Sequence, residues 1–176
     1  MSDFPNAVLV ATESEVEQAY RRLAAALQPR IATGDCVLVG ILMGGMIPAA
    51  RLAAMLTGNF VIDCCQVSRY RGDVKGGELE WLLPPGTDLT GRTVLLIDDI
   101  YDEGITLEHV KSACYERGAV DVVSAVLICK RHERAVDGAG PDFVGLEVDD
   151  HYVFGCGMDY QHRWRHLPAV YALTDE

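Results

Sequence analysis

The sequence predicts an α/β protein in which a central, mostly parallel sheet is flanked by helices. Several apolar runs, such as residues 94–97, lack the alternation of a half-exposed strand. Runs of this kind are typical of strands buried on both faces of a parallel sheet. They alternate along the chain with segments of helical periodicity, and this order favours parallel pairing through helical crossovers.

The first half of the chain contains two expected helices and two expected strands. In the first helix the apolar side chains recur at helical spacing, and Ser14, beside Thr12, is the expected cap. In the second helix Pro48 lies in the first turn, where proline is well tolerated. The expected order is helix 13–27, strand 36–42, helix 47–56 and strand 60–67.

The second half is expected to add strand 93–97, helix 106–117 and strand 122–129. Between residues 68 and 90 the periodicity lapses and glycines and prolines cluster, which is typical of a functional lid or a disordered loop. Residues 142–159 are loop-rich, and we expect them to form a small hood over the strand ends. One domain is expected over 1–176: a core at about 10–135, a hood at about 140–176 with room for an N-terminal contribution, and a mobile loop at about 68–90.

Composition favours a compact cytoplasmic enzyme. A chain of 176 residues with 49% apolar content can fill the core of one domain. The formal charge of −11 argues against a nucleic-acid partner, because phosphate backbones are bound by clustered Lys and Arg. Six cysteines without a CxxC spacing are expected to be free thiols in a reducing compartment. The sequence shows neither an export signal nor an apolar run long enough for a membrane span, so no membrane partner is expected.

The most informative segment is 94–107, where an apolar run ends in Asp98 and Asp99 and a turn then opens a helix. In open α/β sheets, ligands bind at the carboxyl ends of the strands, and a helix N-terminus there attracts anions. Gly104 permits a tight turn and Thr106 offers a hydroxyl. Two acids would repel an anion unless Mg²⁺ or sugar hydroxyls lie between them. The segment therefore predicts a site for a phosphorylated sugar with a metal.

Two other interpretations of this segment are less favourable. An ordinary capped helix would need one acid, whereas Asp98, Asp99 and Asp102 lie within five residues. A phosphorylation receiver domain also has paired acids at a strand end, but there the pair comes near the start of the chain. In this chain the pair comes midway.

Together with other segments, this motif resembles the type I phosphoribosyltransferases, and within them the hypoxanthine-guanine branch. Residues 41–46 are similar to the family's pyrophosphate loop, and residues 67–70 are similar to the start of its mobile catalytic loop. The C-terminal third follows the family's order at compatible spacing. The matching segments there are Lys130 with Arg131, residues 141–145, Tyr152 with Val153, and residues 159–165.

The resemblance implies the type I phosphoribosyltransferase fold and an enzyme of purine salvage. Such an enzyme transfers 5-phosphoribosyl from phosphoribosyl pyrophosphate (PRPP) to hypoxanthine or guanine, giving IMP or GMP and pyrophosphate, with Mg²⁺ as cofactor. Asp102 is then the candidate general base for the purine N7 proton. The partners are PRPP and a 6-oxopurine, and a homo-oligomer, dimer or tetramer, is expected.

The resemblance also assigns the site residues. PRPP would be bound by Asp98, Asp99, Asp102, Glu103, Gly104, Ile105 and Thr106. Pyrophosphate would be bound by Met43, Gly44 and Arg165. The purine would be bound by Lys130, Tyr152, Val153 and Asp159, and Mg²⁺ by Asp98, Asp99 and Asp159. Arg69 and Tyr70 would be the working end of the mobile loop.

The chain departs from the family's common pattern at three positions. Met43 stands where many members have Lys, Glu103 where Ser or Thr is common, and Ile105 where a polar residue is common. A cis peptide between Leu42 and Met43 is expected from the resemblance. Two alternative functions stay open: a xanthine-preferring phosphoribosyltransferase, and a non-catalytic regulator with the same fold.

Overall fold

The computed structural model describes residues 4–32, 34–69, 79–132, 134 and 140–174. Its main sheet has six strands in the order β4-β3-β2-β5-β6-β7, with β4 antiparallel to β3 and the other pairs parallel. The predicted α/β fold with a mostly parallel sheet is confirmed. The strands are β2 (Cys36–Ile41), β3 (Phe60–Arg69), β4 (Leu79–Leu83), β5 (Thr93–Tyr101), β6 (Asp121–Arg131) and β7 (Phe143–Asp149).

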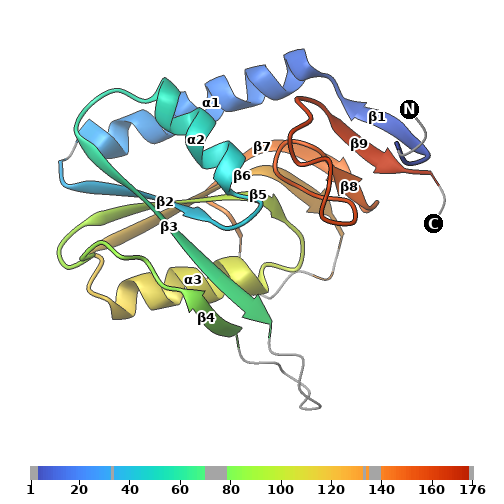
Figure 1. The fold of residues 1–176 in the computed structure, drawn as a ribbon. Coiled ribbons are helices and arrows are strands. Elements are labelled where there is room, and N and C mark those ends of the chain that lie inside the picture. The colour runs from blue at the N-terminus through green and yellow to red at the C-terminus, as the bar shows by residue number, and fades with distance from the viewer. Residues whose placement is uncertain (1–3, 33, 70–78, 133, 135–139, 175–176) are drawn as a thin grey trace.

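Helices cover both faces of this sheet. Figure 1 shows α1 (Glu13–Ala32) and α2 (Met46–Met55) on one face and α3 (Ile105–Glu116) on the other. The alternating side chains of the buried strands pack into one apolar cluster on each face, as with Leu95 toward α1 and Val94 toward α3. Burial on both faces explains why the central strands are apolar without alternation.

The start of α1 is fixed by a reciprocal capping box. Thr12 Oγ1 accepts a hydrogen bond from the Glu15 backbone N–H at 3.3 Å, and Glu15 Oε2 accepts one from the Thr12 backbone N–H at 2.8 Å. Thr12 is therefore the cap, and the expectation of Ser14 in that role is wrong.

A second sheet of three strands stands at one end of the molecule. Its order is β1-β9-β8, so a strand from the start of the chain pairs with one from its end. Figure 1 shows this small sheet beyond the end of the main one. Its strands are β1 (Ala7–Ala11), β8 (Val153–Phe154) and β9 (Val170–Leu173).

Two expectations about loops are wrong. Strand β7 lies at the edge of the main sheet, paired in parallel with β6, although its residues were expected in the hood. Strand β4 pairs with β3 inside the segment expected to be a loop. Residues 70–78 of the expected mobile loop, Tyr70 among them, lie outside the described residues.

Strand register places the loops of the site side by side. Gly40 of β2 pairs with Ile97 of β5, so the loop after β2 begins next to Asp98. Tyr101 of β5 pairs with Cys129 of β6, so the carboxyl end of β6 reaches the turn after β5. All six cysteines are free thiols, as expected. Within the described residues, no helix combines the length and the apolar character needed to cross a membrane.

Candidate functional site

Two carboxylates are buried at the carboxyl end of β5. Asp98 and Asp99 are 9% and 7% exposed. Burial and then the charge of Asp99 raise the pKa of Asp98 well above its ordinary value. Burial raises the pKa of Asp99 too, although Asp98 and Arg165 oppose the rise. Two crowded acids of this kind favour a ligand that donates hydrogen bonds or carries positive charge.

The turn after β5 opens helix α3 and borders a cavity. Gly104 has φ +87° and precedes the first helical residue, and a Cβ there would collide with the ring of Tyr101. The free N–H groups of the first turn of α3 make this end of the cavity suitable for an anion. The cavity measures about 330 Å³ and is lined by residues 98–107 together with Ile41, Leu42, Gly44, Val67 and Arg165. The structure thus brings together all seven residues expected to bind PRPP.

Two glycine-containing loops enclose the far side of this cavity. A Cβ on Gly44 would overlap the carboxylate of Asp99, and a Cβ on Gly157 would overlap the carbonyl oxygen of Gly44. Arg165 donates to the carbonyl oxygen of Gly157 at 2.6 Å and lines the same cavity. The β2–α2 loop, the β5 acids and the hood therefore meet at van der Waals distance.

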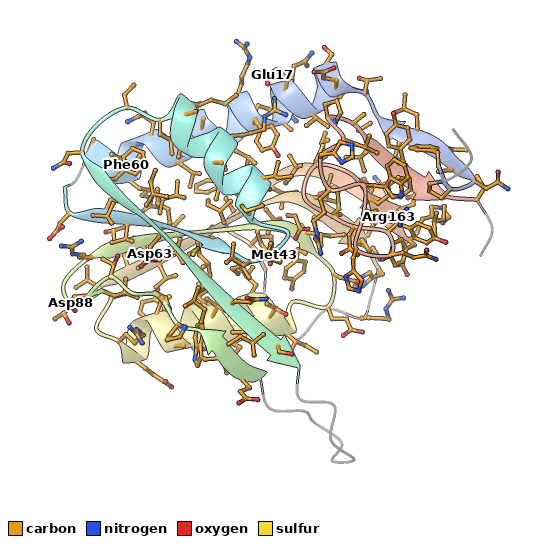
Figure 2. All side chains as sticks on the ribbon, viewed as in Figure 1. Glu17, Met43, Phe60, Asp63, Asp88 and Arg163 are labelled. Carbon is orange, nitrogen blue, oxygen red and sulfur yellow. The ribbon has the colours of Figure 1, made fainter. Side chains whose placement is uncertain are left out.

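Met43 is the expected pyrophosphate residue that is not among those lining the cavity. Its side chain is 45% exposed, and Figure 2 shows it on the loop between β2 and α2. The peptide bond between Leu42 and Met43 is cis, as expected. Arg69 is the last residue of β3.

A second cavity of about 200 Å³ adjoins the first and shares Asp99, Ile100 and Asp102 with it. The hydroxyl of Tyr152 donates to the Asp159 carbonyl oxygen at 2.9 Å, which fixes the ring at the cavity wall. All four residues expected to bind the purine line this cavity. The lining residues are Asp99, Ile100, Asp102, Lys130, Tyr152, Val153, Met158 and Asp159.

Asp102 lies where the two cavities meet and is held by cationic and polar groups. Lys130 Nζ donates to its Oδ2 at 3.2 Å, and His132 Nε2 lies 2.7 Å from its Oδ1. Burial would raise the pKa of Asp102, but the hydrogen bonds from Lys130 and His132 outweigh it and lower the pKa. The carboxylate is therefore ionised at neutral pH, as a proton acceptor must be.

Sequence reasoning missed three residues of this cluster: His132, Arg134 and Asp150. Arg134 binds Asp150 through both its terminal nitrogens, at 2.6 and 2.9 Å, and Lys130 Nζ lies 3.6 Å from Asp150. The signal lay in the pairing of β6 with β7, which places the chain after β7 beside Lys130. That pairing was overlooked because β7 was expected to be a hood loop.

The oxygen-rich part of the site suits a hard cation. Asp98 and Asp99 line the first cavity, and Asp159 lines the second, where it also pairs with Arg165. Carboxylate oxygens without nitrogen ligands are what Mg²⁺ prefers. Ligand atoms of Asp102, His132 and Asp150 also lie within 4.8 Å of one another. In that group, however, Lys130 and Arg134 already neutralise the acids.

The fold and site define an α/β protein with a cavity at its strand ends, lined by acids and a helix N-terminus, and a smaller cavity beside it. A family model described as a phosphoribosyl transferase domain matches residues 10–163. The chain belongs to this family.

Relatives and solved structures agree with this membership. The chain is 32% identical over 169 residues to a hypoxanthine-guanine phosphoribosyltransferase of Lactococcus lactis, covering 96% of this chain and 91% of that protein. It is 31% identical to the enzyme of the same name from Bacillus subtilis, over 94% of this chain and 92% of that one. A crystal structure of a Staphylococcus aureus hypoxanthine phosphoribosyltransferase superposes with a TM-score of 0.87 at 28% identity, covering 94% of this chain and 90% of that one.

Proposed function

We propose that this protein is an enzyme of purine salvage that transfers 5-phosphoribosyl from PRPP to hypoxanthine or guanine, giving IMP or GMP and pyrophosphate. The observation that carries the proposal is the pair of adjoining cavities that share Asp99, Ile100 and Asp102. One cavity has the acids and the helix N-terminus that suit a sugar phosphate. The other has the lysine and tyrosine that suit a 6-oxopurine. The names of the relatives support the same reaction.

PRPP would occupy the larger cavity. The buried carboxylates of Asp98 and Asp99 would accept hydrogen bonds from the ribose hydroxyls. These bonds would stabilise the charged form of both groups, which burial disfavours. Backbone N–H groups of 103–106 would bind the 5-phosphate at the start of α3. The backbone at Gly44 and the guanidinium of Arg165 would bind the pyrophosphate.

The base would occupy the smaller cavity. Lys130 would donate to the exocyclic oxygen, the ring of Tyr152 would stack on the purine, and the backbone of Val153 would bind the base edge. During the reaction the bond from the anomeric carbon to pyrophosphate breaks and its electron pair leaves with the pyrophosphate oxygen. N9 of the purine bonds to that carbon, and Asp102 accepts the proton that N7 loses.

Mg²⁺ fits the donor set of the site, because Asp98, Asp99 and Asp159 present carboxylate oxygens and no softer ligand. Asp98 and Asp99 would hold one ion in the larger cavity, and Asp159 would help to hold a second one near the base. When bound, the cation neutralises charge that builds on the leaving pyrophosphate.

The test is an incubation of the protein with PRPP, Mg²⁺ and one of four bases: hypoxanthine, guanine, xanthine or adenine. IMP and GMP should form, and adenine should give no product because it lacks the exocyclic oxygen for Lys130. If none of the four bases gives a nucleotide, the enzyme proposal is contradicted. Product chiefly from xanthine would instead favour the xanthine-preferring alternative. We also propose that the protein is a homo-oligomer, a dimer or tetramer. Its molar mass, measured by light scattering after size-exclusion chromatography, would test this.

A further inference from the structure

The two oxygens of the Asp102 carboxylate have different surroundings. Oδ1 lies 2.7 Å from His132 Nε2 and 3.5 Å from a terminal nitrogen of Arg134. Oδ2 is bonded by Lys130 Nζ at 3.2 Å. Oδ1 thus faces groups at the end of β6, whereas Oδ2 faces the lysine that lines the cavity for the base.

The contacts of His132 determine its tautomer. Nδ1 lies 3.0 Å from the backbone N–H of Arg134, which donates to it, so Nδ1 carries no proton. Nε2 must therefore carry the proton of a neutral imidazole and donate it to Asp102 Oδ1. The side chain is only 6% exposed, so the ring cannot turn freely in water. Because Nδ1 is already occupied by a donor, His132 has no second site to pass a proton onward.

The pair formed by Lys130 Nζ and Asp102 Oδ2 matches one edge of a 6-oxopurine. That edge presents the exocyclic oxygen beside N7. When N7 carries a proton, the edge shows an acceptor next to a donor, the complement of an ammonium next to a carboxylate oxygen. A bound base would draw Lys130 toward its oxygen and weaken the hydrogen bond from Lys130 to Asp102. His132 makes the shorter of the two contacts to Oδ1 and does not line the cavity for the base, so it can hold Asp102 after the lysine moves.

We propose that His132 is a positioning residue: its Nε2–H holds Oδ1 of Asp102 so that Oδ2 is the oxygen that accepts the N7 proton. This inference rests on the proposed function. Metal binding by Asp102, His132 and Asp150 is the less favourable use of the cluster, because a metal would have to displace Lys130 from Asp102 and Arg134 from Asp150. It would also require Nε2 to lose its proton.

Two variants separate hydrogen bonding from packing. His132→Leu removes the donor, and His132→Gln retains an N–H group at nearly the position of Nε2. The rate of a single turnover with PRPP, Mg²⁺ and hypoxanthine is the measurement, since product release can mask the chemical step in steady state. His132→Leu should lower this rate about tenfold to a hundredfold, the effect of losing one hydrogen bond to a charged group, with little change in PRPP affinity. His132→Gln should recover most of the rate.

Matched controls exclude a purely structural role. His151→Leu changes an exposed histidine in the turn after β7 and should leave the rate unchanged. In an Asp102→Asn background, His132→Leu should cause no further loss, because the two residues act through one carboxylate. An unchanged rate in His132→Leu, no recovery in His132→Gln, or an additive loss in the double variant would overturn the proposal.

The tautomer offers a test that needs no activity. Nitrogen NMR of the imidazole in the unmodified protein should show a protonated Nε2 and an unprotonated Nδ1 at neutral pH. A proton on Nδ1 at that pH would overturn the assignment even if the protein is active. Conversely, a protein with the expected tautomer but no turnover on any base would contradict the proposed function and not the hydrogen bond.

Discussion

The carboxylate of Asp99 lies against the backbone of Gly44, in the space where a side chain on residue 44 would begin. The contact joins the end of β5 to the loop after β2, and the backbone of Gly157 in the hood closes on the same loop. Three segments that are distant in sequence thus meet closely because residues 44 and 157 have no side chain. This close approach places the backbone of the β2–α2 loop beside the acids, at the position proposed for the pyrophosphate.

Gly44→Ala should therefore damage the site. The new methyl group would force Asp99 or the β2–α2 loop to move, which we expect to lower turnover at least tenfold and to destabilise the protein by about 1–3 kcal/mol. Steady-state kinetics and thermal unfolding measure the two effects. Gly140→Ala is the matched control, because a Cβ there meets no atom of the described residues within 4 Å. If Gly44→Ala keeps the turnover and the stability of Gly140→Ala, the contact is dispensable.

Asp102→Asn should lower turnover with hypoxanthine by about 10²- to 10⁴-fold, the usual contribution of a general base. The amide keeps the shape of the carboxylate but does not accept the N7 proton. PRPP affinity, measured by calorimetry in the presence of Mg²⁺, should change little. Equal turnover in the variant and the unmodified enzyme would remove Asp102 as the base.

The sequence was sufficient for the buried parallel core and for residues that lie on its strand ends. Asp98 and Lys130 follow apolar runs, and parallel strands bring such ends to one edge. Strand β7 could not be recognised, because it is an edge strand in which only Gly145 and Val148 are buried. His132 and Asp150 escaped notice for the same reason: their meeting depends on β7 joining the main sheet.

Protein stability should depend on pH through Asp142. Burial would raise its pKa, but hydrogen bonds from the Ser124 N–H and hydroxyl and from Lys111 outweigh it, so the pKa lies below the ordinary value of 3.8. The folded state then binds fewer protons than the unfolded state. The stabilisation is present above about pH 4 and is lost as the pH falls through the lowered pKa.

Asp142→Asn is the variant that tests this dependence. It should reduce the free energy of unfolding by about 1 kcal/mol at pH 7, a modest value because the carboxylate is partly exposed. The difference should shrink at pH 3, as measured by urea unfolding at both pH values. Glu116→Gln, an exposed acid at the end of α3, serves as the comparison. A difference that is as large at pH 3 as at pH 7 would refute the linkage.

Tyr152→Leu should raise the KM for hypoxanthine about tenfold, since an aromatic ring stacked on a base contributes about 1–3 kcal/mol. Tyr152→Phe keeps the ring and loses only the hydroxyl that donates to the Asp159 carbonyl oxygen. The phenylalanine variant should change the KM by no more than about threefold. If the two variants raise the KM equally, the hydroxyl and not the ring is the important part.

Glu103 is the residue whose charge least suits its position, because it lines the cavity proposed for PRPP. Its carboxylate would repel the 5-phosphate at the start of α3. Glu103→Gln removes the charge and should lower the KM for PRPP about threefold, a typical effect of one partly exposed charge. Because salt screens this repulsion, the difference from the unmodified enzyme should narrow as the salt concentration increases.

Glu103→Thr separates the charge from the hydrogen bond. Threonine removes the same charge and adds a hydroxyl of the kind that the family commonly has at this position. If the hydroxyl reaches the 5-phosphate, the KM for PRPP should fall further than in Glu103→Gln, and the additional gain should persist at high salt. A higher KM in both variants would mean that the carboxylate supports the loop and does not repel the phosphate.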